Sequence, residues 1–221
     1  MEKGTHLTGQ RAFCYDYIAV EGLIGAGKTT LCKRMAGERG AREVLEEFED
    51  NPFLPRFYAE PDRYAFAVEL SFLAQRYHQL KRITEQDLFV PRTVADYSLG
   101  KSLVFASVTL NADEYSLFLD LYRIMYGDLP RPELIVYLHL PMERVLQRIA
   151  QRGRSYESAI QTTYLERLQE RYLDHLQKAS GTRVLVVDIG HHDLLLETAS
   201  YDALLRLIDE PMAVGYRSVV L

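Results

Sequence analysis

The glycine-rich turn GLIGAGKTT, at residues 22–30, constrains the fold of this chain more than any other segment. It follows the apolar stretch YDYIAVEG and has the spacing G-x-x-x-x-G-K-[ST], in which backbone N–H groups point inward at phosphate oxygens. In this pattern Lys28 contacts the β- and γ-phosphates of a nucleoside triphosphate, and the Thr29 hydroxyl binds Mg²⁺. The helix that follows directs its positive end at the same anion. The predicted phosphate-binding residues are Gly22, Leu23, Ile24, Gly25, Ala26, Gly27, Lys28, Thr29 and Thr30.

Strands and helices alternate along the rest of the chain. Five stretches are rich in β-branched residues: 15–22, 41–47, 92–98, 134–140 and 183–190. Longer segments with helical spacing separate them, which predicts an α/β fold with a five-stranded parallel sheet flanked by helices. We expect residues 1–14 to be a flexible N-terminal tail and residues 15–221 to form a single domain.

Two of the helical segments have clear boundaries. One runs from Pro61 to about Gln86, with apolar residues at spacings of three and four. The other begins after Asn111, where Glu114 stands three residues on in a capping-box arrangement, and ends near Gly127.

The bulk composition limits the classes of partner. The formal net charge of −5 argues against nucleic acid, because binding a nucleic-acid backbone needs a broad basic face. The two cysteines are too few for a disulfide framework, which favours a reducing, cytoplasmic location. The longest apolar runs have the length of a strand, so no membrane span is expected.

Arginines crowd into the segment RVLQRIAQRGRSYE, which begins at Arg144. Spacings of four place several of them on one helix face, where a solvated basic surface is the simplest interpretation. A phosphoryl-transfer site, however, needs cations over the β- and γ-phosphates, which favours a binding role for this segment. We therefore expect a lid over residues 148–160 that holds the donor's phosphates. The predicted lid arginines are Arg148, Arg152 and Arg154.

Acidic residues follow the second and third predicted strands. Glu46 and Glu47 lie where the end of a strand would face the phosphate-binding turn, and a carboxylate there can accept the proton of an attacking hydroxyl. A solvated acidic run is an equal alternative. Asp96 follows the third strand, where it can help to bind Mg²⁺ or can serve as a helix cap or turn residue.

From about Tyr17 onward the chain resembles the deoxynucleoside kinases. The resemblance rests on six motifs in order: GLIGAGKT, EEFEDNPFLPRFY, RYAFAVELSFLAQR, DYSLGKSLVFA, RGRSYE and VVDIGHHDLL. It implies a P-loop kinase fold with an arginine-rich lid, and transfer of the γ-phosphoryl group of ATP to the 5′-hydroxyl of a deoxynucleoside in nucleotide salvage. It also implies a homodimer that uses Mg²⁺.

The resemblance assigns a role to each matching position. Glu46 resembles the general base, and Tyr58 and Glu157 resemble the pair that binds the sugar 3′-hydroxyl. The residues that resemble base-binding positions are Glu69, Arg76 and Phe105. The loop from His191 to Leu194, with His192 and Asp193, matches the segment that borders the donor adenine. The substrate-binding set implied in this way is Glu46, Tyr58, Glu69, Arg76, Asp96, Phe105 and Glu157.

Three residues depart from the family pattern. Glu69 stands where many relatives have a glutamine, and an ionised carboxylate accepts but cannot donate hydrogen bonds. It would therefore prefer a base edge that carries donors, with a weak lean to purines, unless it pairs with Arg76 instead. Lys101 replaces an aspartate of some relatives. Tyr97 replaces the arginine of an acid-Arg-Ser motif, which removes one cation from the site.

Three alternatives remain open on sequence grounds, and one of them is a phosphotransferase relative that has lost activity, which the replacement of the arginine by Tyr97 would allow. A nucleoside monophosphate kinase, for example one acting on thymidylate, would need cations for the acceptor's own phosphate, whereas the second strand ends in Glu46 and Glu47. A P-loop protein that binds nucleotide without catalysing transfer would need no sugar-binding pair such as Tyr58 and Glu157.

Overall fold

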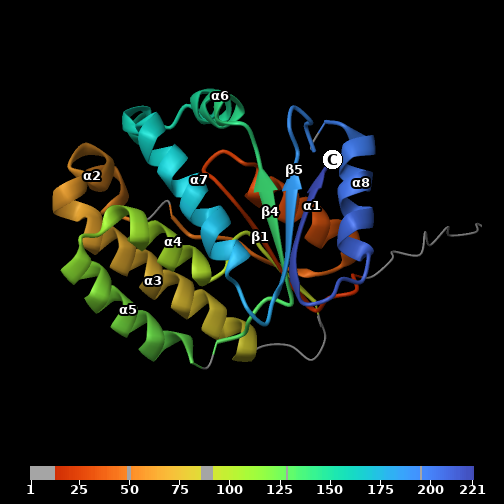
Figure 1. Cartoon of the computed structure of the whole chain (residues 1–221), viewed down its shortest axis with the longest axis horizontal. Helices are drawn as coiled ribbons and strands as arrows, with labels where there is room; N and C mark the ends of the chain where they lie inside the picture. Colours follow the sequence, from red (N-terminus) through yellow and green to blue (C-terminus); the bar gives the residue numbers. More distant parts are fainter. Residues whose placement is uncertain (1–12, 49–50, 86–91, 128, 195) are drawn as a thin grey trace, which may run out of the picture.

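The computed structural model of the chain describes residues 13–48, 51–85, 92–127, 129–194 and 196–221 (Figure 1). Its centre is one sheet in which the strands that the structure describes all run parallel, in the order β2-β3-β1-β4-β5-β6. The strands are β1 (Tyr17–Gly22), β2 (Arg42–Val44), β3 (Thr93–Ala95), β4 (Leu134–His139), β5 (Arg183–Asp188) and β6 (Gly215–Val220).

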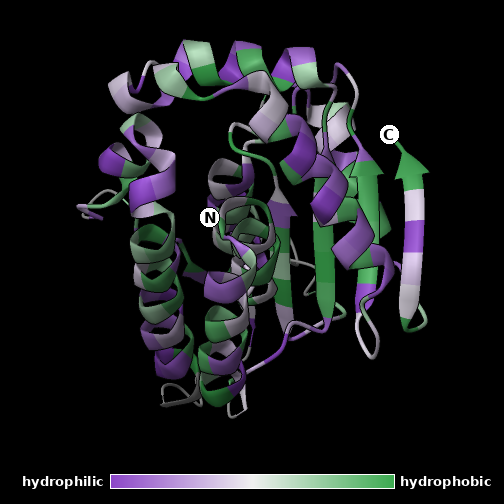
Figure 2. Ribbon diagram, turned by 60° about the vertical axis from the view of Figure 1, so that its left-hand side comes forward, coloured by the Kyte–Doolittle hydropathy of each residue, from purple (hydrophilic) through white to green (hydrophobic). Residues whose placement is uncertain are grey.

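The sheet has six strands where the sequence predicts five. The additional strand, β6, pairs in parallel with β5 at the edge of the sheet. Its sequence, GYRSVV, alternates between half-buried and exposed positions, because an edge strand has one face turned to solvent. Figure 2 shows the resulting mixture of polar and apolar residues beside the mainly apolar inner strands. This is why β6 lacks the continuous apolar run that identifies β4 and β5.

Helices cover both faces of the sheet. On one side lie α1 and α8, and on the other α7, α4, α3 and α5 form a thick layer (Figure 1). The helix α6 and a short 3₁₀ segment, η1, lie above the carboxyl ends of the strands. The helices are α1 (Lys28–Arg39), α2 (Leu54–Ala59), α3 (Pro61–Glu85), α4 (Gly100–Thr109), α5 (Ala112–Tyr126), α6 (Met142–Arg152), η1 (Ser155–Ala159), α7 (Thr162–Gln177) and α8 (Thr198–Asp209).

The helix boundaries follow the local signals in the sequence. The side chain of Asn111 accepts a hydrogen bond from the backbone N–H of Glu114, and the Glu114 side chain bonds back to the Asn111 N–H, so the predicted capping box is confirmed. Gly153, with φ of 66°, takes the left-handed conformation that ends α6. The long predicted helix is α3, although Gln86, its expected last residue, lies outside the described residues.

The core has two main parts. One packs β1, β4 and β5 against α1, α7 and α8 and includes Ile18, Val136 and Leu204, all fully buried. The other joins α3, α4 and α5 and contains Leu73 and Phe118. A third, smaller cluster around Phe57 and Val68 supplies most of the apolar wall of the candidate site.

The predicted N-terminal tail falls almost entirely outside the described residues. At its end, Phe13 is buried in the core, and the Cys14 thiol donates a hydrogen bond to the backbone carbonyl of Asp209. In the part of the chain that the structure describes, no helix has both the length and the apolar character needed to cross a membrane.

Candidate active site

The parallel topology brings three predicted site residues to the same edge of the sheet. The strand β3 lies between β1 and β2, so the segments after these strands are neighbours. Asp96, directly after β3, accepts a hydrogen bond from the backbone N–H of Glu46 at 2.7 Å. Its other carboxylate oxygen accepts the hydroxyl of Thr29, the second residue of α1. One aspartate thus ties the phosphate-binding turn to the end of β2.

The turn between β1 and α1 has the backbone of a phosphate-binding loop. Gly22 has a φ of 150°, and a Cβ atom there would lie 2.9 Å from the carbonyl oxygen of Leu138, so only glycine fits. The ammonium of Lys28 donates to the Leu23 carbonyl at 2.8 Å. Burial, together with the nearby charge of Lys101, lowers the pKa of Lys28 to about 8. An anion bound in the loop would stabilise the charged form of Lys28 and attract its ammonium group.

A cavity of about 770 Å³ opens from this loop toward the helical layer. It is bounded by the turn after β1, by α2, α3 and α4, and by the lid segment around η1. The predicted site residues that line it are Ile24, Gly25, Lys28, Thr29, Glu46, Tyr58, Glu69, Arg76, Asp96, Phe105, Arg152, Arg154 and Glu157. Residues from 24 to 157 in the sequence therefore form a single site.

A second hollow also borders the phosphate-binding loop. It shares Lys28, Thr29 and Glu46 with the first cavity and is also lined by Thr30 and Arg148. The two hollows are therefore adjacent at the loop.

The carboxylate of Glu46 is held by two cations. Its Oε1 atom accepts hydrogen bonds from Nε and Nη2 of Arg76, at 2.8 and 2.6 Å, and its Oε2 atom accepts one from Lys101. Burial alone would raise the pKa of Glu46, but Lys101 and Arg76 outweigh it and lower the pKa to about 2. The carboxylate is therefore ionised at neutral pH. Its neighbour Glu47 points outward, where it is 65% exposed near Arg82.

In this structure the guanidinium of Arg76 binds Glu46 and does not take the predicted role of reading the base. Besides its two bonds to Glu46, the guanidinium donates through Nη1 to the hydroxyl of the buried Ser102, at 2.6 Å. The sequence left open an ion pair between Arg76 and Glu69, and the structure does not contain it. The Oε1 atom of Glu69 instead accepts a hydrogen bond from the Thr109 hydroxyl at 3.1 Å.

Glu69 lines the cavity and is only 3% exposed. Its Oε2 atom is buried and has no hydrogen-bond partner among the described residues. Burial raises the pKa of this carboxyl to about 7, although Arg76 and the Thr109 hydroxyl act in the opposite direction. Glu69 therefore has an unused acceptor inside a pocket whose walls include the rings of Phe72 and Phe105.

The lid arginines are paired with an acid of the lid itself. Arg152 binds both carboxylate oxygens of Glu157, and Arg154 approaches the same carboxylate at 3.5 Å. Glu157 is 5% exposed, so these contacts neutralise a buried charge. Arg148 instead donates to the Ala26 carbonyl of the phosphate-binding loop at 3.2 Å.

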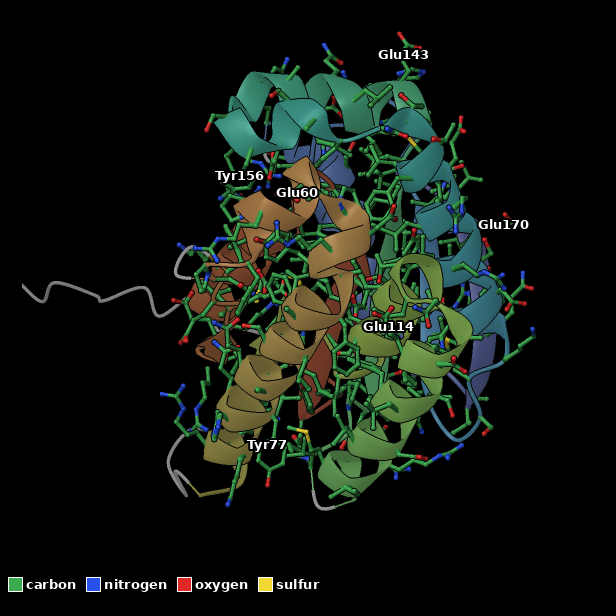
Figure 3. The ribbon with its side chains drawn as sticks, turned by 90° about the vertical axis from the view of Figure 1, so that its left-hand side faces the viewer. Glu60, Tyr77, Glu114, Glu143, Tyr156 and Glu170 are labelled. Atoms are coloured by element: carbon green, nitrogen blue, oxygen red, sulfur yellow. The ribbon has the colours of Figure 1, made fainter. Side chains whose placement is uncertain are left out.

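The sugar-binding pair predicted from the family is brought together. Tyr58 and Glu157 both line the cavity, and burial followed by the charge of Glu157 raises the pKa of the Tyr58 phenol above its usual value. Tyr58 also stacks on Tyr156, with ring centroids 6.1 Å apart. Figure 3 shows Tyr156 where the lid segment meets α2. Tyr156 was not predicted from the sequence, because its spacing from the other site residues gives no signal.

The two residues predicted beside the donor adenine lie further away. His192 and Asp193 line neither hollow. Asp193 approaches Arg148 of α6 at 4.0 Å, and His192 contacts Glu197 at 2.9 Å. Of the two, only Asp193 is linked to a residue of the second hollow, through Arg148.

Two further residues have a signal in the sequence: Glu21, a buried acid at the end of β1, and Phe72, an aromatic residue that lines the cavity. Glu21 is a charged residue at the end of an apolar strand, and it is 1% exposed. It accepts hydrogen bonds from the backbone N–H of Ser98 at 2.7 Å and from the hydroxyl of Tyr172 at 3.2 Å. Phe72 stands three residues after Glu69 and four before Arg76, which places it on the same face of α3.

A phosphate-binding loop whose far side opens into a cavity with an ionised carboxylate defines a P-loop phosphotransferase that acts on a small acceptor. The sequence model described as "Deoxynucleoside kinase" matches residues 18–212. The chain therefore belongs to the deoxynucleoside kinase family. It is an enzyme of the kinase class.

Individual relatives support the same assignment. The chain is 35% identical to a deoxyguanosine kinase of Bacillus subtilis, over 88% of this chain and 96% of that protein. It is 32% identical to a deoxyadenosine/deoxycytidine kinase of the same organism, over 84% of this chain and 88% of that protein. A solved deoxyadenosine kinase from M. mycoides with bound dATP has the same fold, with a TM-score of 0.74 at 23% identity, covering 88% of this chain and all of that one.

Proposed function

We propose that the protein transfers the γ-phosphoryl group of ATP to the 5′-hydroxyl of a deoxynucleoside and so supplies monophosphates for nucleotide salvage. The observation that carries this proposal is the position of Glu46. Its carboxylate lines the same cavity as Lys28, and Asp96 links its backbone to the phosphate-binding turn. An acceptor hydroxyl bound at Glu46 would thus face the last phosphate of the donor.

In the proposed reaction, the bond between the γ-phosphorus and the ADP oxygen breaks as a bond to the 5′-oxygen forms. The hydroxyl proton passes to Glu46. Because phosphoryl transfer has a loose transition state, the proton leaves late, so Glu46 first orients the hydroxyl and accepts its proton as the new bond forms. Lys28 and the lid arginines would neutralise the charge on the phosphates.

The residues present fit a bound Mg²⁺. The hydroxyl of Thr29 and the carboxylate of Asp96 are in hydrogen-bond contact, and Mg²⁺ prefers oxygen ligands, of which phosphates and water supply the remainder. We propose Thr29 and Asp96 as its protein ligands. When bound with ATP, the ion would offset the negative charge of the phosphates.

The other cavity residues would hold the nucleoside. We propose that Tyr58 and Glu157 bind the 3′-hydroxyl and that Phe105 packs against the base. The pairing of Glu157 with Arg152 and Arg154 supports a lid that acts on both substrates, since one carboxylate connects the sugar site to the phosphate cations. His192 and Asp193 would border the adenine of ATP.

For the base, we propose a preference for purines and for guanine in particular. Guanine presents two neighbouring donors, its ring N–H and its amino group, to the unpartnered oxygen of Glu69. The names of several relatives, which are deoxyguanosine kinases, agree with this preference. Adenine offers only one donor beside an acceptor, which suits a protonated Glu69 better.

The function is tested by incubating the protein with ATP, Mg²⁺ and each of the four deoxynucleosides or their monophosphates. We expect new 5′-monophosphate from the nucleosides, with deoxyguanosine giving the highest kcat/KM. Products from monophosphates alone would instead indicate a nucleoside monophosphate kinase. ATP hydrolysis that no acceptor changes would indicate a nucleotide-binding protein that does not transfer phosphate.

The base preference should depend on pH through Glu69. Its pKa of about 7 means that the carboxylate, an acceptor only, predominates above pH 7, and the carboxyl, which can also donate, below it. The ratio of kcat/KM for deoxyguanosine to that for deoxyadenosine should therefore rise about tenfold between pH 6 and pH 8. The charged or ionisable groups that face Glu69 are Arg76 of α3, Lys101 of α4, Glu46, Tyr58 and Tyr164.

Glu69→Gln provides the control, because an amide donates and accepts at every pH. We expect its ratio to stay flat and to favour deoxyadenosine. Folding raises the pKa of Glu69 from 4.5 to about 7, so its ionisation destabilises the fold as pH rises through that window. The stability of Glu69→Gln relative to wild type should therefore be greater at pH 8 than at pH 5. A wild-type ratio that does not change with pH would exclude a contact between Glu69 and the base.

We also propose a homodimer. Leu117 and Ile124 stand seven residues apart on α5, and they are 52% and 79% exposed, so this helix offers an apolar stripe to a partner. Light scattering on the purified protein should give twice the monomer mass, and Ile124→Glu should return it to the monomer mass.

A further inference from the structure

Lys101 is the cation nearest the second oxygen of Glu46, and it comes from an unexpected part of the fold. It is the second residue of α4, its side chain is 6% exposed, and its ammonium contacts Glu46 Oε2. The next residue, Ser102, holds Arg76, which occupies the other oxygen of the same carboxylate. The first turn of α4 thus organises both cations around Glu46.

Tyr97 supplies no charge to this site. It is fully buried, and its hydroxyl donates to Oε1 of Gln79 at 2.7 Å, away from the cavity. Gln79 in turn donates to the Leu45 carbonyl at 2.9 Å and so supports the backbone beside Glu46. Tyr97 therefore positions the backbone beside Glu46, and Lys101 supplies the positive charge at this carboxylate.

The two cations on Glu46 have different freedom to move. Arg76 is fixed by two bonds to Glu46 and one to Ser102. Lys101 has a flexible four-carbon stem and three donors on a compact ammonium, so it can change partner with little rearrangement. Its ammonium also lies 5.5 Å from the centre of the Phe105 ring, inside the acceptor cavity.

The proposed reaction changes the charge on the partner of Lys101. Before transfer, Glu46 is one anion that is shared by two cations, Lys101 and Arg76. When the 5′-hydroxyl proton moves to Glu46 and the P–O5′ bond forms, Glu46 becomes neutral and a phosphate monoester appears beside it. A buried cation that loses its anion is costly, so the ammonium gains by moving to the new anion.

We propose that Lys101 is a catalytic cation that leaves Glu46 during phosphoryl transfer and binds the oxygens of the newly formed 5′-phosphate. This inference rests on the proposed function, because it needs Glu46 as the proton acceptor. In the wild-type protein Lys101 would contact Glu46 before the reaction and the product phosphate after it. It would thus supply the charge that the tyrosine of the DYS motif cannot.

The test compares Lys101→Met with wild type and with Lys178→Met, in which a lysine that pairs with Asp174 at the end of α7 is changed in the same way. Two quantities are measured: kcat with saturating ATP, Mg²⁺ and deoxyguanosine, and the affinities for deoxyguanosine and its 5′-monophosphate by calorimetry. We expect Lys101→Met to lower kcat about 10²-fold, as removal of one transition-state donor does. Monophosphate affinity should fall at least tenfold, and deoxyguanosine affinity less than threefold.

Equal losses of affinity for the nucleoside and its monophosphate would overturn the inference, because they would indicate a merely structural lysine. Turnover at the wild-type level in Lys101→Met would overturn it as well. If the methionine variant does not fold, Lys101→Gln keeps a donor for Glu46 without the charge, and the same losses are expected. Failure of the proposed function is distinct, since it would appear as absence of monophosphate product with the wild-type protein.

Discussion

Replacing Glu46 with glutamine should lower kcat by about 10²–10⁴-fold, the usual contribution of a positioned general base. The amide of Glu46→Gln cannot take the proton of the 5′-hydroxyl, and it leaves Lys101 and Arg76 without their anion. Deoxynucleoside binding should be largely intact, because the sugar and base contacts lie elsewhere in the cavity. Single-turnover measurement of monophosphate formation, with calorimetry for nucleoside affinity, checks both parts.

Glu47→Gln is the matched control, since it makes the same chemical change one residue along the chain. Its side chain is 65% exposed, and we expect near wild-type turnover. Loss of the anion in Glu46→Gln should also lower the melting temperature, because breaking a buried ion pair costs about 3–5 kcal/mol. Near-normal turnover in Glu46→Gln, or a large loss in Glu47→Gln, would move the role of base to Glu47 or to water.

Replacing Lys28 with methionine should lower kcat/KM for ATP by about 10³-fold or more. The lysine is half-buried in the phosphate-binding turn, and the motif predicts that it contacts the β- and γ-phosphates. Lys28→Arg should not restore activity, because a planar guanidinium cannot replace the compact point charge of an ammonium. Steady-state kinetics with varied ATP measures the effect.

The deoxynucleoside site provides the internal control for Lys28→Met. The proposed sugar- and base-binding residues belong to α2, α3, α4 and the segment around η1, so nucleoside affinity should change less than about threefold. Activity within tenfold of wild type would mean that the anion is held by the backbone and the lid arginines alone. A parallel loss of nucleoside binding would indicate a misfolded turn.

Much of the fold was predictable because the relevant signals are local. The spacing of glycines before Lys28 depends on backbone conformation, and the capping box at Asn111 depends on residues three apart. The apolar runs of β4 and β5 reflect burial on both faces. The strand β6 was missed because an edge strand is exposed on one side and its residues alternate.

The partners of the site residues were not predictable in the same way. Arg76 and Lys101 both meet Glu46, although 30 and 55 residues separate them from it in the sequence. Only the packing of α3 and α4 against the end of β2 decides this. The orientation of Tyr97 into the core also depends on Gln79, a residue of another helix.

The sequence by itself determined the phosphate-binding turn, the parallel α/β architecture and the family, because these follow from spacing and local pattern. Tertiary structure alone decided which of two adjacent glutamates faces the cavity, which cations hold it ionised and which oxygen of Glu69 has no partner. The physical reason is that charge, burial and hydrogen bonding depend on neighbours in space, and helices far apart in the chain supply those neighbours.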